Sequence, residues 1–364
     1  MDDFARLSPE ERRAFIDETA TRMDLTPIIV EKDFWVCWTL RRLTRFPDLA
    51  GHVTFKGGTS LSKAYGIIKR FSEDIDLTIR SNAPGLTDTK PPMVSGIGRK
   101  ERDRRITALK KAAQAYVQDV ARPALVRAIG EALGMEEDWS VELDPDDADN
   151  QTLLFHYPRA FATATMETDK GYIKPRIKLE YGARGEPEPY KTQTIRPYLA
   201  EQFPDEFLDA DTDVETLSIE RSFWEKVTIL HALHHNDKFR AGMSRHYYDV
   251  VMLDRAGITA RALADPDLLL RVVRNKSLMF GDQSASYDTA VRGTMRLQLS
   301  EAILTPFMRD YAAMEEMFMD QPPAASHILE ILKSLEQRIN AVGKETTTEA
   351  GYMTAQEGEA GMAL

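Results

Sequence analysis

The sequence predicts an α+β protein, with a mixed β-sheet in the N-terminal part of the chain and helices in the C-terminal part. Segments of β composition cluster between residues 52 and 197, whereas apolar residues after Leu217 recur at helical spacing. The chain has 364 residues, enough for two domains with cores of their own. We expect a sheet domain with N-terminal helices over 1–215, a helical domain over 216–342 and a disordered polar tail over 343–364.

The composition is typical of a soluble globular protein, with 43% hydrophobic and 29% charged residues. The first residues lack the pattern of a signal peptide, and no apolar run reaches the roughly 18–20 residues that span a bilayer. We therefore expect a cytoplasmic protein that does not bind a membrane. The single cysteine, Cys37, excludes an internal disulfide framework and a multi-cysteine zinc site.

The charge is negative overall but uneven along the chain. A net charge of −11 does not favour indiscriminate binding to nucleic acids. Residues 99–111 nevertheless form a basic block, which either docks a phosphate backbone or is a solvated helix face.

Two helices are predicted before the first strand. Ser8-Pro-Glu-Glu11 is typical of a capping box with proline in the first turn. Thr26-Pro27 begins a second helix, which we expect to extend to about Arg45.

A glycine turn follows a short predicted strand over 52–56. Gly57 and Gly58 permit positive φ angles and a close approach of the backbone. Thr59 and Ser60 are expected to cap the next helix, which is predicted to extend to about Tyr65. Because N–H groups and hydroxyls at a helix N-terminus bind anions, we predict a phosphate site here. The spacing is not that of a Walker loop.

Two carboxylates, Asp74 and Asp76, follow the glycine turn on a predicted strand. Ile75 and Leu77 alternate with them, which indicates a strand with one buried face. The two aspartates therefore share the other face, where two close carboxylates are unfavourable unless a cation lies between them. The pattern predicts a divalent-metal site beside the phosphate site, a combination suited to nucleotidyl or phosphoryl transfer.

The middle of the chain is predicted to contain a turn-rich loop over 81–98, a helix over about 100–133, and strands. The strand candidates are 152–157, 172–181 and, more weakly, 192–197. Pro175 indicates that the second of these begins near that point.

A third acid is expected on this later strand. Leu179 and Tyr181 alternate with Lys178 and Glu180, which places Glu180 on the face opposite the apolar residues. We predict that Glu180 can meet the two aspartates there.

Helices are predicted from about Arg221 through the regions of Tyr247 and Leu268. Three histidines lie on the first of them, but no zinc-binding spacing accompanies them, so we interpret them as packing and surface residues.

The order of strand, Gly-Gly-Thr-Ser turn, helix and Asp-x-Asp, with a third acid on a later strand, resembles the polymerase β-like nucleotidyltransferase fold. A closer resemblance is to the AbiEii/AbiGii-type nucleotidyltransferase toxins of bacterial type IV toxin–antitoxin and abortive-infection systems. It spans about residues 25–255 and is carried by Glu31-Lys-Asp-Phe-Trp35, Phe55-Lys-Gly-Gly-Thr-Ser-Leu-Ser62, Arg70-Phe-Ser-Glu-Asp-Ile-Asp-Leu77, Lys178-Leu-Glu-Tyr181, Phe223-Trp-Glu-Lys-Val227 and Arg245-His-Tyr-Tyr-Asp249.

The resemblance implies a Mg²⁺-dependent enzyme that transfers a nucleoside monophosphate from an NTP to an RNA acceptor and releases pyrophosphate. The expected acceptor is the 3′ end of tRNA, so that translation stops, as in phage defence. A cognate antitoxin that carries a DNA-binding winged helix is the implied partner.

The resemblance also implies a role for each matched residue. The nucleotide phosphates are expected to contact Gly57, Gly58, Thr59 and Ser60. Asp74 and Asp76 are expected to bind Mg²⁺, with Glu180 as the third acid. Lys226 is expected to neutralise the triphosphate, Asp249 to complete the site, and Arg70 either to anchor phosphate or to pair with Glu73.

One departure from the wider superfamily concerns the third acid. That position commonly holds an aspartate, whereas this chain has the longer Glu180, which leaves the general-base assignment open. Two alternative functions also stay open: a nucleotide-binding module without catalysis, and transfer of a nucleotide to a protein, which the net negative charge allows.

Overall fold

The computed structural model describes residues 1–72, 74–135, 138–161 and 174–341. The chain divides into two compact units, which are described separately. The first unit contains Met1–Ser218 and Glu316–Asp320, and the second contains Ile219–Glu315 and the residues from Gln321 onward. The predicted disordered tail lies outside the described residues.

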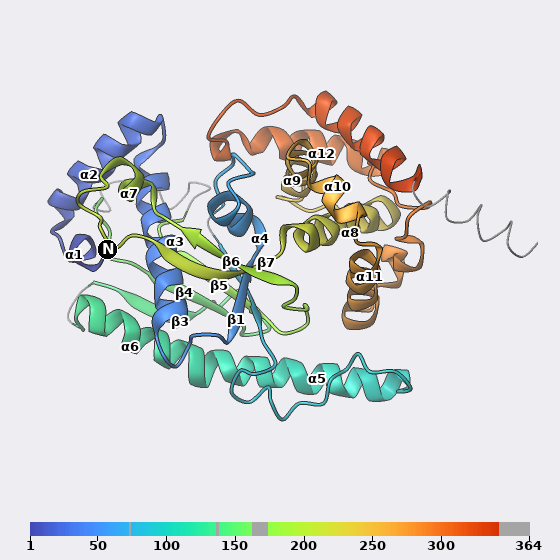
Figure 1. Cartoon of the computed structure of the whole chain (residues 1–364), viewed down its shortest axis with the longest axis horizontal. Helices are drawn as coiled ribbons and strands as arrows, with labels where there is room; N and C mark the ends of the chain where they lie inside the picture. Colours follow the sequence, from blue (N-terminus) through green and yellow to red (C-terminus); the bar gives the residue numbers. More distant parts are fainter. Residues whose placement is uncertain (73, 136–137, 162–173, 342–364) are drawn as a thin grey trace, which may run out of the picture. The chain divides into compact units, whose positions relative to one another are not determined.

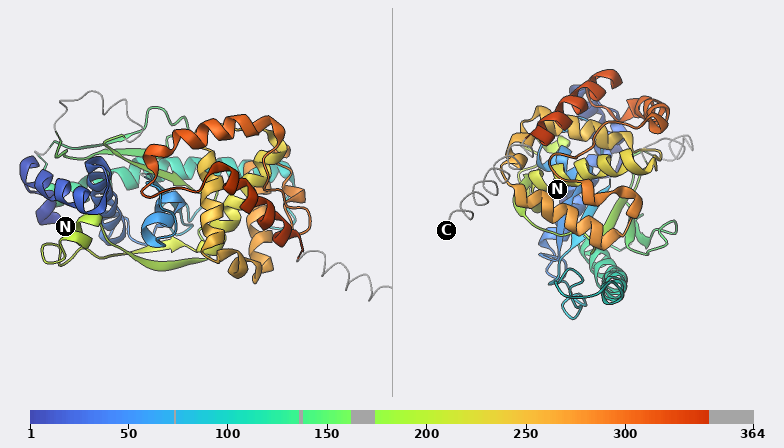
Figure 2. Two further views of the ribbon diagram at one scale, coloured as in Figure 1. Left: turned by 90° about the horizontal axis from the view of Figure 1, so that it is seen from above. Right: turned by 90° about the vertical axis from the view of Figure 1, so that its right-hand side faces the viewer.

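The first unit opens with the predicted helices. Helix α2 carries the expected capping box, in which the Ser8 backbone N–H donates to Glu11 Oε2 over 2.9 Å and the Glu11 N–H donates to Ser8 Oγ over 3.3 Å. The helices of the first unit are α1 (Asp2–Ala5), α2 (Pro9–Met23), α3 (Pro27–Arg45), α4 (Gly57–Thr59), α5 (Arg99–Ala115), α6 (Arg122–Leu133) and α7 (Tyr198–Gln202). The wider π-helical turn η1 (Ser60–Ala64) extends α4, and η2 (Tyr116–Ala121) joins α5 to α6 into one long helix, which the right-hand view of Figure 2 shows almost end-on.

A seven-stranded mixed sheet forms the centre of the first unit, in the order β3-β4-β5-β2-β1-β7-β6 (Figure 1). The strands are β1 (Val53–Lys56), β2 (Ile75–Ile79), β3 (Ser140–Leu143), β4 (Thr152–His156), β5 (Ile177–Gly182), β6 (Tyr190–Ile195) and β7 (Thr212–Leu217). Strand β2 pairs antiparallel with β1 and parallel with β5, so the strand that follows Asp74 lies inside the sheet. The predicted α+β class with a mixed sheet is confirmed.

One face of the sheet is apolar and forms the core with α3. Ile75 and Leu77 on β2 are buried there, and Leu77 pairs with Tyr181 of β5. Phe155 stacks on Trp38 of α3 with ring centroids 6.0 Å apart. The opposite face carries the polar residues that alternate with these, including Asp76 and Glu180. The apolar residues of the strands therefore orient the predicted acids away from the core.

Two strands were not predicted, namely β3 and β7. Strand β3 has only four residues, and β7 has six, of which Asp213 and Glu215 are acidic, so neither segment is distinguished from a loop by its composition. Pairing with β4 and with β1 and β6 supplies the backbone hydrogen bonds that stabilise them. The predicted strand 172–181 begins at Ile177, two residues after Pro175; residues 172 and 173 lie outside the described ranges.

The second unit is helical. Its helices are α8 (Ile219–Asn236), α9 (Ser244–Arg255), α10 (Ile258–Leu263), α11 (Pro266–Phe280), α12 (Glu301–Ala313) and a helix over 325–341, with short turns η4 (Gln283–Ala285) and η5 (Tyr287–Thr289). The short turn η6 (Glu315–Met317) begins at the end of the segment Ile219–Glu315 and continues into the residues of the first unit. In the described parts of both units, no helix is long and apolar enough to cross a membrane.

The buried His231 of α8 uses both ring nitrogens in the fold of the second unit. Its Nε2 lies 3.0 Å from the Ser286 carbonyl oxygen, and its Nδ1 accepts the Arg296 N–H over 3.1 Å. Burial lowers the pKa of His231 to about 4. This residue therefore has a packing role.

Candidate active site

The glycine turn is shaped to receive Asp76. Gly57 has φ = +80°, and a Cβ added there would lie 1.7 Å from Asp76 Oδ2. Lys56, the residue before it, pairs directly with Asp76 across β1 and β2. The carboxylate of Asp76 thus occupies the space that any larger residue at position 57 would need, so glycine is required here for two independent reasons.

The second glycine lies against Arg70 and Ser72. A Cβ added at Gly58 would lie 2.6 Å from Ser72 Oγ and 2.8 Å from Arg70 Nη2. Arg70 is only 1% exposed, and one of its guanidinium nitrogens donates to the Phe71 carbonyl oxygen over 3.4 Å. The structure therefore places this predicted phosphate ligand at the back of the glycine turn. The alternative partner, Glu73, lies outside the described residues.

The hydroxyls of Thr59 and Ser60 bond to the backbone, and neither caps a helix. The helical turn begins at Gly57, which places both residues inside it, so the predicted cap is wrong. Thr59 Oγ1 donates to the Asp74 carbonyl oxygen over 2.5 Å, and Ser60 Oγ donates to the Gly57 carbonyl oxygen over 2.9 Å. Both side chains are fully buried. Thr59 thereby fixes the main chain of Asp74 to the glycine turn.

The third acid lies next to the second aspartate. Glu180 of β5 is the direct partner of Asp76 of β2 in the parallel register, so their side chains share one face. Asp74 immediately precedes β2. The three predicted acids therefore gather at the start of β2 and on the neighbouring strand.

A lysine lies among these acids. Lys178 Nζ is 2.6 Å from Glu180 Oε1 and 3.9 Å from Oδ2 of the buried Asp144. Although burial opposes its charge, the hydrogen bond to Glu180 and the charges of Glu180, Asp74 and Asp144 raise the pKa of Lys178. Sequence reasoning assigned no role to Lys178 or Asp144. For Lys178 a signal existed, since it lies two residues before Glu180 on the same strand face.

The Glu31-Lys-Asp segment of α3 contacts the helical turn that follows the two glycines. Asp33 of α3 forms a buried ion pair with Lys63 of η1, with 2.9 Å between Oδ1 and Nζ. Asp33 Oδ2 also accepts the Tyr198 N–H over 2.7 Å, and Lys63 Nζ lies 3.8 Å from the centre of the Tyr198 ring. Burial opposes the charge of Lys63, but Asp33 raises its pKa. The helical turn after Gly57 and Gly58 is thereby fixed to α3.

The neighbouring charges of this segment hold other parts of the chain. Glu31 Oε1 accepts the Ala160 N–H over 2.6 Å, and Lys32 Nζ donates to the Lys174 carbonyl oxygen over 2.5 Å. Burial raises the pKa of Glu31 to about 7, despite the opposing hydrogen bond and nearby arginines. Each of the three charged residues of this segment thus binds another part of the fold.

Lys226 and Asp249 form a pair within the second unit. Lys226 Nζ on α8 lies 2.8 Å from Asp249 Oδ2 on α9, and the side chains are 10% and 0% exposed. A buried carboxylate needs such a partner, because an isolated buried charge is strongly unfavourable. The structure thus brings these two predicted residues together.

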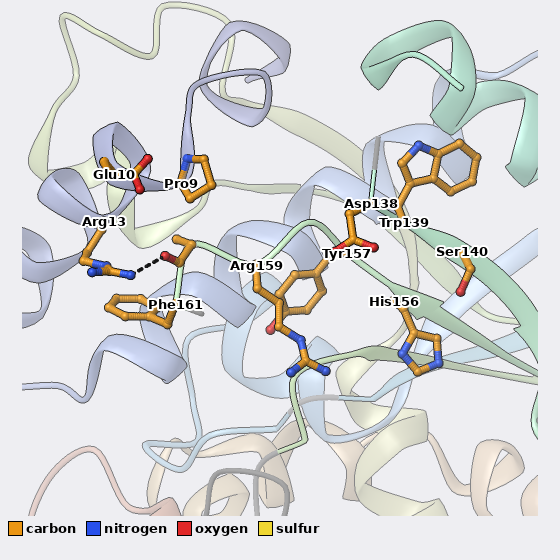
Figure 3. Close-up of a pocket in the computed structure, with 11 residues that line it drawn as sticks. Pro9, Glu10, Arg13, Asp138, Trp139, Ser140, His156, Tyr157, Arg159 and Phe161 are labelled. Atoms are coloured by element: carbon orange, nitrogen blue, oxygen red, sulfur yellow. Dashed lines mark hydrogen bonds between the residues drawn. The ribbon is translucent and has the colours of Figure 1, made fainter. Parts of the chain in front are cut away.

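A separate cavity of about 590 Å³ lies beside β3 and β4 in the first unit (Figure 3). Aromatic Trp139, Tyr157 and Phe161 line it together with Arg13 and Arg159. Arg13 Nη2 donates to the Ala160 carbonyl oxygen over 3.0 Å, which commits one of the two guanidinium groups to the fold. None of the predicted site residues lines this cavity.

The donor set of the candidate site suits a divalent cation with oxygen ligands. Among the residues that the structure describes, no group of three or more His, Cys, Asp or Glu side chains is arranged to hold a metal ion. Asp74 and Asp76 supply two carboxylates, however, and Mg²⁺ usually takes one or two from the protein, with phosphates and waters completing its shell. The two aspartates therefore fit a divalent cation whose remaining ligands are phosphates or waters.

Comparison with known proteins identifies the family. Residues 38–340 match the family model described as nucleotidyl transferase AbiEii toxin of type IV toxin–antitoxin systems. No curated protein shows significant sequence similarity to the chain. Among solved structures, the nucleotidyltransferase toxin MenT4 of Mycobacterium tuberculosis H37Rv is 13% identical, with a TM-score of 0.39 over 89% of this chain and 98% of that one. Because the family match covers most of the sequence, the chain belongs to the AbiEii family of nucleotidyltransferase toxins.

Proposed function

We propose that this nucleotidyltransferase moves a nucleoside monophosphate from an NTP to the 3′ end of tRNA, with Mg²⁺ as cofactor and pyrophosphate as the second product. The observation that carries the proposal is the carboxylate of Asp76, which lies against Gly57 with Glu180 beside it in register. A glycine turn and strand acids at one place are what transfer to a hydroxyl acceptor requires. The RNA acceptor follows from the resemblance to the family.

The first unit supplies the reacting centre in this proposal. Main-chain N–H groups of the turn from Gly57 to Thr59 bind the phosphates in this proposal, because the Thr59 and Ser60 hydroxyl protons are donated to the main chain and the Ser60 N–H donates to the Gly57 carbonyl oxygen. Asp74 and Asp76 hold the divalent cation, which neutralises charge that develops on the triphosphate. Glu180 accepts the proton of the attacking hydroxyl. Arg70 stabilises the back of the turn and supplies positive potential close to Gly58.

The second unit supplies Lys226 and Asp249 in this proposal. Lys226 neutralises the pyrophosphate that leaves, because an ammonium is a compact charge suited to phosphate. Asp249 holds that ammonium at 2.8 Å and so fixes where it points. Loss of Asp249 then weakens transfer through Lys226.

The biological context of the proposal is growth arrest. Modified tRNA stops translation in the cytoplasm, and a cognate antitoxin with a DNA-binding winged helix restrains the toxin. Phage infection is the expected occasion for its release.

The proposal is tested with purified protein, Mg²⁺, each α-labelled NTP in turn, and total RNA with lysate protein. We expect label in a tRNA-sized band with wild-type protein, and none with Asp76→Ala. Asp17→Ala, at an exposed aspartate of α2, is the matched control and should retain full transfer.

Two other outcomes would replace the proposed function. Label on protein would show that the acceptor is a polypeptide, which the net charge of −11 permits. NTP binding without label on any acceptor would leave a nucleotide-binding module. Full transfer by a stably folded Asp74→Ala/Asp76→Ala protein would refute the assignment of the two aspartates.

A further inference from the structure

The Lys178 ammonium lies within the polar face that carries the candidate catalytic acids. It contacts Glu180 Oε1 at 2.6 Å and lies 3.9 Å from Asp144 Oδ2. Register places it on the same face as Glu180, two residues along β5, and Glu180 is the direct partner of Asp76. Lys178 therefore places a positive charge among the carboxylates of Asp76, Asp144 and Glu180, which we call the acid group.

The surroundings of Lys178 explain why a cation is needed there. Asp144 is buried, with its side chain 6% exposed, and its Oδ1 accepts the Asp146 N–H over 3.1 Å. Glu180 is 40% exposed, so it can turn from one partner to another without unfolding the strand. Close carboxylates repel each other unless a positive charge lies between them. In the absence of nucleotide, Lys178 supplies that charge.

We propose that Lys178 is a positioning residue whose ammonium takes the place of the divalent cation at the acid group until the metal and nucleotide bind. Its hydrogen bond holds Glu180 next to Asp76 before substrate arrives. When the cation binds, it competes with Lys178 for the negative charge, and the ammonium is released from Glu180. The inference rests on the proposed function, in which Asp74 and Asp76 bind the divalent ion.

The first test measures the affinity of the nucleotide-free protein for Mn²⁺ by calorimetry. We expect Lys178→Met to bind Mn²⁺ about tenfold more tightly than wild type, because a competing positive charge is removed. Lys178→Arg retains the charge and should bind like wild type. Lys191→Met, at an exposed position of β6, is the control for the loss of any lysine.

A double-mutant cycle separates the contact from a general effect of charge. If Lys178 acts through Glu180, then Lys178→Met should change the Mn²⁺ affinity much less in a Glu180→Gln background. Amine acetylation read by mass spectrometry gives an independent measurement. Lys178 should be acetylated faster when Mn²⁺ is present, and this increase should be missing in Asp76→Ala.

The outcomes distinguish the two proposals. Equal Mn²⁺ affinity of wild type and Lys178→Met would overturn the role of Lys178 alone. An equal effect of Lys178→Met with and without Glu180 would also overturn it, because the contact would then be irrelevant. Wild-type protein that binds no Mn²⁺, or Asp76→Ala that binds it unchanged, would overturn the metal site of the proposed function itself.

Discussion

Replacement of Gly57 by alanine should strongly lower the rate of nucleotide transfer while the protein stays folded. The added Cβ would lie 1.7 Å from Asp76 Oδ2 and 2.9 Å from Asp76 Cβ, so the carboxylate or the turn must move by more than 1 Å. A displacement of about 1 Å at a catalytic group typically lowers the rate about 100-fold. We expect at least that loss in the rate of label transfer to RNA.

The same substitution should also lower stability through two separate contributions. An alanine at φ = +80° is strained by roughly 1–2 kcal/mol. Overpacking against Asp76 adds about 1–3 kcal/mol. Urea unfolding followed by intrinsic fluorescence should therefore show a loss of about 2–5 kcal/mol for Gly57→Ala.

Gly85 offers a matched control within the same unit. It also has φ = +80°, but a Cβ added there would have no heavy atom within 4 Å. Gly85→Ala should therefore show the backbone strain alone and retain full transfer. In an Asp76→Gly background Gly57→Ala should no longer cause the additional loss of stability from overpacking, because the side chain with which it clashes is gone.

The clash of a side chain at position 57 with Asp76 would be refuted by Gly57→Ala protein that transfers nucleotide as fast as Gly85→Ala. It would equally be refuted if the two substitutions destabilised the protein to the same extent. Either result would mean that Asp76 does not occupy the space above Gly57.

Three further predictions concern buried titratable groups outside the candidate active site. Lys63→Met should lower the free energy of unfolding by about 3–5 kcal/mol, because it leaves Asp33 charged and buried, and Lys63→Met/Asp33→Leu should recover part of that loss in urea unfolding. The pKa of Glu31 is raised from 4.5 to about 7, so its contribution to stability is fully present below pH 4.5 and is lost as pH rises to 7. In wild type the free energy of unfolding should therefore fall by about 3 kcal/mol over this interval, and Glu31→Gln should remove that decline. The pKa of His231 is lowered from 6.5 to about 4, so its contribution is present above pH 6.5 and is lost as pH falls to 4; His231→Gln should flatten the profile over that acidic interval.

Each of these predictions has a result that contradicts it. Lys63→Met protein as stable as wild type would mean that the Asp33 pair contributes nothing. For Glu31, a gain in the free energy of unfolding between pH 4.5 and 7 that disappears in Glu31→Gln would contradict the burial of this carboxyl group. For His231, a gain in the free energy of unfolding on acidification that disappears in His231→Gln would contradict the burial of the imidazole.

Local signals were sufficient for the longer helices of the first unit and for most of its strands, whereas the short helices α1 and α7 were not predicted. The capping box at Ser8, the proline at Pro27 and the strand before Gly57 were all predicted where the structure has them. Such signals act within a few residues, so they survive without knowledge of the fold. The short strands β3 and β7 lacked them, and only their sheet partners reveal them.

The sequence by itself indicated the chemistry that we propose for this protein. Two glycines, an Asp-x-Asp strand and the alternation around Glu180 indicated a phosphate turn, a pair of acids and the face on which the third acid lies. These features depend on backbone periodicity and on the lack of a glycine side chain, both of which are properties of short segments.

Only the tertiary structure decided which residues meet. Parallel register places Glu180 opposite Asp76 although 104 positions separate them, and the ion pair of Lys63 with Asp33 and the approach of Lys178 to Asp144 likewise join distant parts of the chain. The hydroxyls of Thr59 and Ser60, predicted as caps, turned out to hold the main chain because the helix begins at Gly57. Long-range register and the partner of a buried charge are set by the burial of the whole sheet, which no short segment encodes.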